Sequence, residues 1–217
     1  LLHEKGINWF KNILVDKYYR KPISPLRKEP VNKLIDYLGW QKQNSDKWFV
    51  GLPLLSGRLT GDKKITIRKL VEKFNLDLRL TPNQDVLICN ILNKNKCEIE
   101  SVLKDIGYGN LNNINEIQRH ALACPALPLC GLAMTEAERI LPDILERIDN
   151  LLKSLNIEKT ILFRITGCPN GCSRPYMAEL ALVGSGLNKY QLWLGGSKNL
   201  QRLAKPYLQR MPLENME

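Results

Sequence analysis

The sequence lacks several features that would place the protein in a familiar class. Every apolar run is interrupted by Pro, Lys or Gly well before 18 residues, so we expect no membrane-spanning helix. Six cysteines among 217 residues are too few for a disulfide scaffold, and no signal or transit peptide is recognisable, so we expect a reducing, cytoplasmic environment. There is no internal repeat, zinc-finger spacing, RNP signature or clear helix-turn-helix, which leaves nucleic acid a possible but weak candidate partner.

The composition is that of an ordinary globular protein, with 44% hydrophobic and 25% charged residues. The net charge of +10 is distributed unevenly: residues 1–80 hold 17 Lys and Arg against 8 Asp and Glu, and residues 81–217 hold 15 against 14. This basic excess favours an anionic partner, although a solvated Lys-rich face explains it equally well. The chain begins at Leu1 within an amphipathic stretch, so we expect it to be a piece of a longer polypeptide.

The first part of the chain shows helical and strand patterns in a recognisable order. Residues 1–20 predict an amphipathic helix, and the three prolines of residues 21–30 predict a linker. Residues 47–109 then predict the order β-α-β-β-α, which resembles most of a split βαβ unit.

A second region begins near residue 118. Thr135 and Glu138 have the spacing of a capping box, so a helix is predicted over residues 135–155, divided or kinked at Pro142. A strand is predicted at residues 160–166 and two more at residues 179–196.

Four cysteines form two closely spaced pairs, Cys124 and Cys130 in "CPALPLC" and Cys168 and Cys172 in "CPNGC". Prolines and glycines make both loops irregular, so backbone N–H groups are free to point at sulfur and tune a reduction potential. A C-x5-C pair suits structural zinc poorly, disulfides conflict with a reducing environment, and four packing thiols would be an unusual core. Ligation of an iron–sulfur cluster by four thiolates is therefore favoured, with these alternatives open.

The other two cysteines are given no role. Cys89 lies inside the apolar run "DVLICNIL" and is interpreted as a packing residue. Cys97 lies in the polar run "NKNKCEIE", with no partner at a useful spacing.

Long stretches around these loops, "ACPALPLCGLAMTEAERILP" and "RITGCPNGCSRPYMAEL", resemble the C-terminal half of the sirohaem-dependent nitrite/sulfite reductases. Further similar segments are "KWFVGLPLLSGRL", "LRLTPNQDVLIC" and "LVGSGLNKYQLWLGGS". The resemblance implies an α/β (α+β) chain in three parts. These are an N-terminal helix and Pro-rich linker (1–37), a ferredoxin-like half-domain (38–112), and a mixed α/β domain that binds a 4Fe–4S cluster and sirohaem (113–217).

The resemblance also implies a function and a set of site residues. Cys124, Cys130, Cys168 and Cys172 would ligate the 4Fe–4S cluster, and Cys172 would also bridge to the sirohaem iron as the catalytic thiolate. The activity would be the six-electron reduction of sulfite to sulfide in sulfur assimilation. Further expected contacts to sirohaem come from two loops: Thr166, Gly167 and Asn170 in one, and Arg79, Asn83 and Gln84 in the other. A plain turn-capping role for Asn83 is an equal alternative.

The residues inside the C-x5-C loop resemble those at the same place in ferredoxin-dependent sulfite reductases. This resemblance makes acidic ferredoxin the expected electron donor and sulfite the expected substrate. In a photosynthetic eukaryote the location would be the plastid stroma. The alternatives are a sirohaem nitrite reductase and an electron-transfer module that holds a cluster without sirohaem. The resemblance implies that an earlier half of the same chain supplies most groups that bind sirohaem and sulfite, so this part alone is expected to be inactive.

Overall fold

The computed structural model describes residues 1–19, 36–111, 114–157, 161–197, 199 and 201–215. By its internal contacts the chain divides into residues 1–32 and 33–217. The predicted Pro-rich linker at 21–30 lies outside the described residues.

Within the first unit, helix α1 (Leu2–Leu14) continues into a single wider π-type turn at Val15–Tyr19. The helix is kinked at Gly6, whose φ of 79° is left-handed and favours glycine. The predicted helix at residues 1–20 is thus confirmed over most of its length. None of the residues of α1 is buried, although Ile7 and Phe10 are large and apolar.

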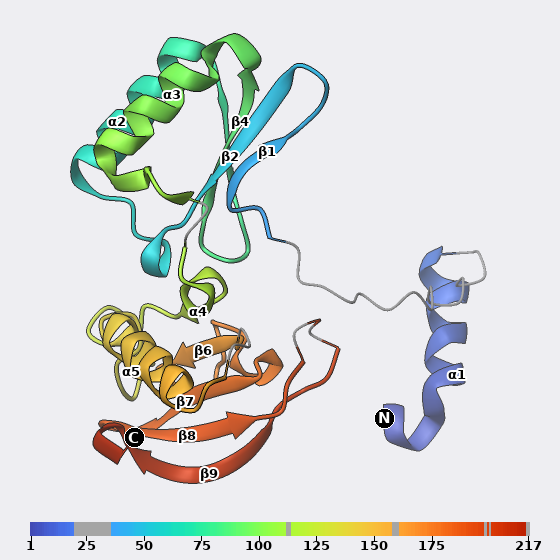
Figure 1. Cartoon of the computed structure of the whole chain (residues 1–217). Helices are drawn as coiled ribbons and strands as arrows, with labels where there is room; N and C mark the ends of the chain where they lie inside the picture. Colours follow the sequence, from blue (N-terminus) through green and yellow to red (C-terminus); the bar gives the residue numbers. More distant parts are fainter. Residues whose placement is uncertain (20–35, 112–113, 158–160, 198, 200, 216–217) are drawn as a thin grey trace. The chain divides into compact units, whose positions relative to one another are not determined.

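The first sheet of the second unit is antiparallel, with the strand order β1-β2-β4-β3. Its strands are β1 (Gly39–Lys42), β2 (Lys47–Leu52), β3 (Asp77–Leu80) and β4 (Val86–Leu92). Helices α2 (Gly61–Phe74) and α3 (Lys96–Leu103) lie along one face, and their buried side chains pack with those of β2 and β4 in one cluster (Figure 1). The predicted β-α-β-β-α order is confirmed, and the structure adds β1, whose short sequence carries little signal.

The second sheet has five strands in the order β5-β6-β7-β8-β9, parallel from β5 to β7 and antiparallel from β7 to β9. The strands are β5 (Leu122–Ala123), β6 (Phe163–Thr166), β7 (Leu180–Gly186), β8 (Lys189–Leu194) and β9 (Lys205–Pro212). Helix α5 (Leu141–Ser154) lies against this sheet (Figure 1), and the short helix α4 (Glu116–Arg119) precedes β5. The predicted mixed α/β class is confirmed.

Helix α5 packs on the sheet through one apolar stripe. Leu141, Ile144, Leu145 and Ile148 are buried, at the i, i+3, i+4 and i+7 spacing of a single helix face. They join Phe163 and the other inward-facing residues of the sheet in one core cluster. Each such side chain contributes about 1.5–3 kcal/mol on burial, which holds the helix and the sheet together.

The start of this helix differs from the prediction. Helix α5 begins at Leu141, not at Thr135, and Pro142 lies in its first turn, where a missing N–H costs nothing. The predicted capping box is wrong because its two side chains are used elsewhere. The Thr135 hydroxyl donates to Tyr190 Oη at 3.0 Å, and Glu138 pairs with Arg58.

No helix among the described residues is long and apolar enough to cross a membrane.

Candidate cluster and cofactor site

The two cysteine loops follow two neighbouring parallel strands. Cys124 comes directly after β5, and Cys168 comes two residues after the end of β6. Because β5 and β6 pair in parallel, with Ala123 opposite Ile165, their carboxyl ends meet at the same edge of the sheet. This edge is where open α/β sheets bind ligands, since loops there diverge and leave backbone groups unpaired.

The end of β6 is bonded to the sulfur of the first loop. The backbone N–H of Gly167 donates to Cys124 Sγ at 3.2 Å, and the Thr166 hydroxyl donates to the same sulfur at 3.4 Å. Both donors are buried, so they act on the sulfur in a low-dielectric setting. The structure therefore brings Thr166 and Gly167 to the Cys124 sulfur, while their expected contact with sirohaem stays a prediction.

The four cysteines differ in exposure along this edge. Cys124 and Cys168 are buried, Cys130 is half-buried and Cys172 is exposed, as is the neighbouring Asn170. Two thiols thus face the protein interior, while Cys172 and Asn170 present a sulfur and an amide outward.

Among the described residues, no three His, Cys, Asp or Glu side chains form a group that could hold a metal ion. A cube of four irons and four sulfides is larger than a single ion, so its ligands stand farther apart. The donor set fits such a cube in kind, because cysteine thiolates are its usual ligands and one sulfur already accepts two hydrogen bonds.

Close backbone packing holds the two loops in place. A Cβ built on Gly167 would lie 2.6 Å from Ala126 Cβ and 2.8 Å from the carbonyl oxygen of Thr135. The Gly167 carbonyl accepts a hydrogen bond from Met134 N–H at 2.8 Å, which fastens the segment after Cys130 to the end of β6. Only glycine fits between the two loops at this position.

The turn between β3 and β4 contacts both cysteine loops. Gln84 Nε2 donates to the carbonyl of Ala123 at 2.9 Å, immediately before Cys124. Arg174 lies two residues beyond Cys172. Its Nη2 donates to the carbonyl of Pro82 at 2.7 Å and to Asn83 Oδ1 at 3.3 Å. The structure therefore places Asn83 and Gln84 beside the cysteine loops, where both bond to protein groups.

Among the described residues, no hydrogen bond joins Arg79 to the cysteine loops. Arg79 is exposed on β3, and its positive charge acts on Cys89. Burial raises the pKa of the Cys89 thiol, and the Arg79 guanidinium partly offsets that rise. Cys89 itself is buried in β4, as expected of a packing residue, and Cys97 is exposed at the start of α3.

The structure adds residues that sequence reasoning missed. The hydrogen bonds of Arg174 run to the β3–β4 turn, and burial lowers its pKa. A Cβ on Gly184 would lie 2.3 Å from the carbonyl oxygen of Gly167, so this glycine lets β7 approach the site closely. A glycine inside a strand pattern is the signal that could have identified it. Arg164, in the middle of β6, is 1% exposed, and its sequence context "FRIT" reads only as a strand.

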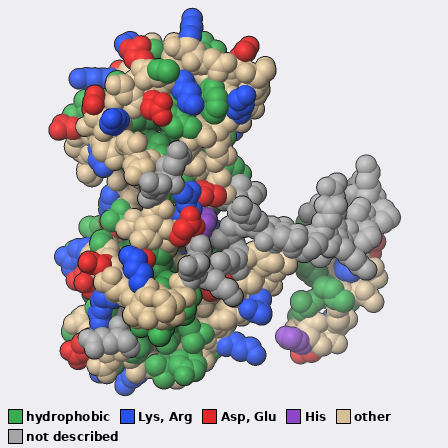
Figure 2. Space-filling view, viewed as in Figure 1, with side chains coloured by type: hydrophobic (Ala, Val, Ile, Leu, Met, Phe, Trp, Pro, Cys, Tyr) green, Lys and Arg blue, Asp and Glu red, His purple; other side chains and the backbone are tan. Residues whose placement is uncertain are grey.

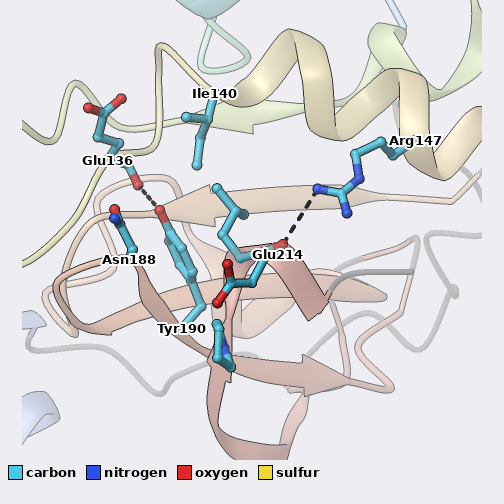
Figure 3. Close-up of a pocket in the computed structure, with 8 residues that line it drawn as sticks. Glu136, Ile140, Arg147, Asn188, Tyr190 and Glu214 are labelled. Carbon is cyan, nitrogen blue, oxygen red and sulfur yellow. Dashed lines mark hydrogen bonds between the residues drawn. The ribbon is translucent and has the colours of Figure 1, made fainter.

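A separate cavity of about 460 Å³ lies between the start of α5 and the end of β9 (Figure 3). Its wall includes Tyr190, whose hydroxyl donates to the carbonyl of Glu136 at 2.7 Å and whose pKa burial raises to about 12. On another side, Arg147 Nη1 donates to the carbonyl of Leu213 at 3.5 Å. None of the predicted site residues lines this cavity. Its two hydrogen bonds join β8 to the segment before α5, and α5 to the residue after β9.

Charges are mixed on the face of the molecule that Figure 2 shows. Lys and Arg side chains lie among Asp and Glu side chains there, over both sheets. This mixing is what a solvated face looks like. Residues 20–35, which hold five Lys and Arg and one Glu, lie outside the described part of the chain.

Comparison with known proteins decides the family. Residues 41–106 match the family model described as the nitrite/sulfite reductase ferredoxin-like half domain. A protein of Synechococcus elongatus named sulfite reductase (ferredoxin) is 47% identical over 216 residues, which cover 97% of this chain and 34% of that protein. A sulfite reductase (NADPH) hemoprotein beta-component of Nitrosomonas europaea is 36% identical, over 95% of this chain and 36% of that protein.

The chain belongs to the nitrite/sulfite reductase family.

This family member spans about a third of the length of these curated relatives. The NirA protein of Mycobacterium tuberculosis shares its fold, with a TM-score of 0.81 over 98% of this chain and 41% of that one, at 23% identity. The family match at residues 41–106 covers most of the first sheet with α2 and α3, so the expected ferredoxin-like half-domain is confirmed. The boundaries at residues 37 and 112 stay a prediction.

Proposed function

We propose that the whole protein to which this chain belongs is an assimilatory sulfite reductase, which reduces sulfite to sulfide with six electrons supplied by ferredoxin. The observation that carries the proposal is the 47% identity, over nearly the whole chain, to a protein named sulfite reductase (ferredoxin). The convergence of the two cysteine loops at one sheet edge supports it.

In this proposal the thiolates of Cys124, Cys130, Cys168 and Cys172 would hold a 4Fe–4S cluster, and the Cys172 thiolate would also serve as a ligand of sirohaem. When bound, the two groups supply single-electron storage and a metal on which the sulfur oxyanion is reduced. The chain's own residues hold and orient them. Thr166 and Gly167 donate hydrogen bonds to the Cys124 sulfur, which stabilises negative charge there.

The exposed pair Cys172 and Asn170 supports a cofactor face on the outer side of the C-x3-C loop. Asn83 and Gln84 take part by holding the β3–β4 turn against both loops, while direct contacts of Asn83, Gln84 and Arg79 to sirohaem stay predictions. A cytoplasmic location also stays a prediction.

The proposal is tested with the full-length protein, purified without oxygen. We expect about four iron atoms and four sulfides per cluster, the added visible bands of sirohaem, a spectral change on adding sulfite, and sulfide as the product. A spectrum with iron–sulfur absorption alone would instead identify a cluster-only electron-transfer module. Ammonia formed from nitrite at a much higher kcat/KM than sulfide from sulfite would identify a nitrite reductase.

Cys172→Ser provides the sharper test of the shared thiolate. We expect at least about a 100-fold loss of sulfite reduction and loss of the magnetic coupling between the two iron centres in electron paramagnetic resonance. Cys97→Ser is the matched control, because Cys97 is exposed and distant in sequence from both loops, and it should retain full activity. Full activity and unchanged coupling in Cys172→Ser would refute the shared ligand.

A further inference from the structure

Arg164 is a charged residue whose side chain is buried in the protein interior. It sits in the middle of β6 between the core residues Phe163 and Ile165, and only 1% of its surface is exposed. Burying a cation costs several kcal/mol unless an anion and hydrogen bonds compensate. A buried arginine in a strand therefore requires a partner.

The described protein groups do not supply that partner. Arg164 Nη1 donates to the carbonyl of Arg174 at 3.1 Å, but Nε is buried with no hydrogen-bond partner. Among the described residues, no carboxylate forms an ion pair with Arg164, and the charge that acts on it is the positive charge of Arg174. Burial, and secondarily the positive charge of Arg174, lowers the pKa of Arg164 to about 10, which leaves it charged at neutral pH.

The position of this unbalanced charge indicates what balances it. Arg164 lies four residues before Cys168 on the strand that leads into the C-x3-C loop, and it bonds to the carbonyl two residues after Cys172. The charge thus lies at the base of the loop that carries two of the proposed ligands. Four thiolates around an iron–sulfur cube make an anion, and this anion would face a buried cation across a low-dielectric medium.

We propose that Arg164 is the buried counter-charge of the anionic cluster held by the cysteine loops, and that it positions the backbone after Cys172 through the Arg174 carbonyl. This inference rests on the proposed function. Reduction adds one negative charge to the cluster, so a nearby fixed cation stabilises the reduced form more than the oxidised form. Arg164 therefore raises the cluster's reduction potential and favours acceptance of electrons from the donor.

The test measures the reduction potential of the cluster in the full-length holoenzyme by redox titration with spectroscopic detection. At the potential where half of the wild-type clusters are reduced, Arg164→Gln should lower the ratio of reduced to oxidised cluster about tenfold, a shift of 59 mV for one electron. Arg164→Lys keeps the charge and should remain within about threefold of wild type. Arg210→Gln is the matched control, because it removes one exposed arginine from β9 of the same sheet, and its ratio should not change.

An Arg164→Gln holoenzyme with full iron content and the potential of the Arg210→Gln control would overturn the inference. The inference would also be overturned if Arg164→Lys lowered the reduction potential as far as Arg164→Gln does, because the shape of the side chain and not its charge would then be responsible. If Arg164→Gln binds no iron, the Lys variant decides: retained iron supports a need for the charge, and lost iron contradicts it. Absence of any cluster from the wild-type protein would instead refute the proposed function.

Discussion

Asp85 illustrates how one residue near the β3–β4 turn responds to its surroundings. Burial raises the pKa of its carboxyl to about 6, a hydrogen bond from Leu54 N–H opposes that rise, and the charge of Asp36 adds to it. The unfolded chain releases this proton near pH 3.9. Between these two values the folded state binds the proton and the unfolded state does not, so the contribution of Asp85 to stability is fully present below about pH 4 and is lost as pH rises through about 6.

We therefore expect Asp85→Asn to stabilise the full-length protein at pH 7 by about 2 kcal/mol, after allowance for partial exposure, and to have little effect at pH 4. An amide keeps an oxygen that can accept the Leu54 N–H without the cost of a buried charge. The measurement is chemical denaturation of wild type and variant across this pH range. Asp46→Asn, at an exposed position, is the control; a gain that is equal at pH 4 and pH 7 would contradict the prediction.

At single residues, the sequence identifies the candidate ligands. The four cysteines, with Thr166 and Gly167 beside them, stand out because Pro and Gly interrupt both loops, and their role in binding a cluster stays a prediction. Arg164 was not recognisable in that way. An arginine in a strand is normally exposed, and only the packing of β6 between β5 and β7 shows that Arg164 is buried.

At the scale of elements, the site depends on the parallel pairing of β5 and β6. Their neighbouring carboxyl ends bring together two loops whose first cysteines, Cys124 and Cys168, are 44 residues apart in sequence. Strand β5 has only two residues, so no periodicity could have predicted it. Helix α5 and the β7–β8 hairpin carry clear patterns and were predicted, although the predicted helix began at residue 135 and α5 begins at Leu141.

The crowding at Gly167 leads to a prediction about these elements. A methyl group there would collide with Ala126 on one side and with the Thr135 backbone on the other, so Gly167→Ala must push the loops apart. We expect a loss of about 1–3 kcal/mol of stability and a lower iron content. Apparent melting temperature and iron per chain in the full-length protein are the measurements.

Gly186→Ala, at the end of β7, is the matched control because its added Cβ would meet nothing closer than 4.0 Å. Gly167→Ala protein with the melting temperature and iron content of this control would show that the loops tolerate the methyl group.

At the scale of the whole molecule, the uneven charge bears on the electron donor. Residues 20–35 hold five Lys and Arg against one Glu, and so contribute four of the nine excess positive charges of residues 1–80. If acidic ferredoxin docks through these charges, raising the ionic strength from about 0.05 M to about 0.5 M should weaken its affinity for the full-length enzyme at least about tenfold.

The affinity is measured by titration of ferredoxin at several salt concentrations. Replacing Arg27 and Lys28 by Gln should reduce the salt dependence, whereas replacing Arg68 and Lys69 on α2 serves as the control for an equal loss of charge. An affinity that does not change with salt would show that the basic segment is only a solvated face.

The sequence by itself determined the chemistry: four thiols in two Pro- and Gly-rich loops, the family resemblance, and the main helices and strands, because each depends on neighbours along the chain. The tertiary structure alone decided the geometry: which sulfur accepts hydrogen bonds, which cysteine faces outward, and which arginine is buried without an acid. These properties arise from strand pairing and burial between distant segments. A local pattern cannot encode them, because the same residues in an exposed strand would be free to remain solvated.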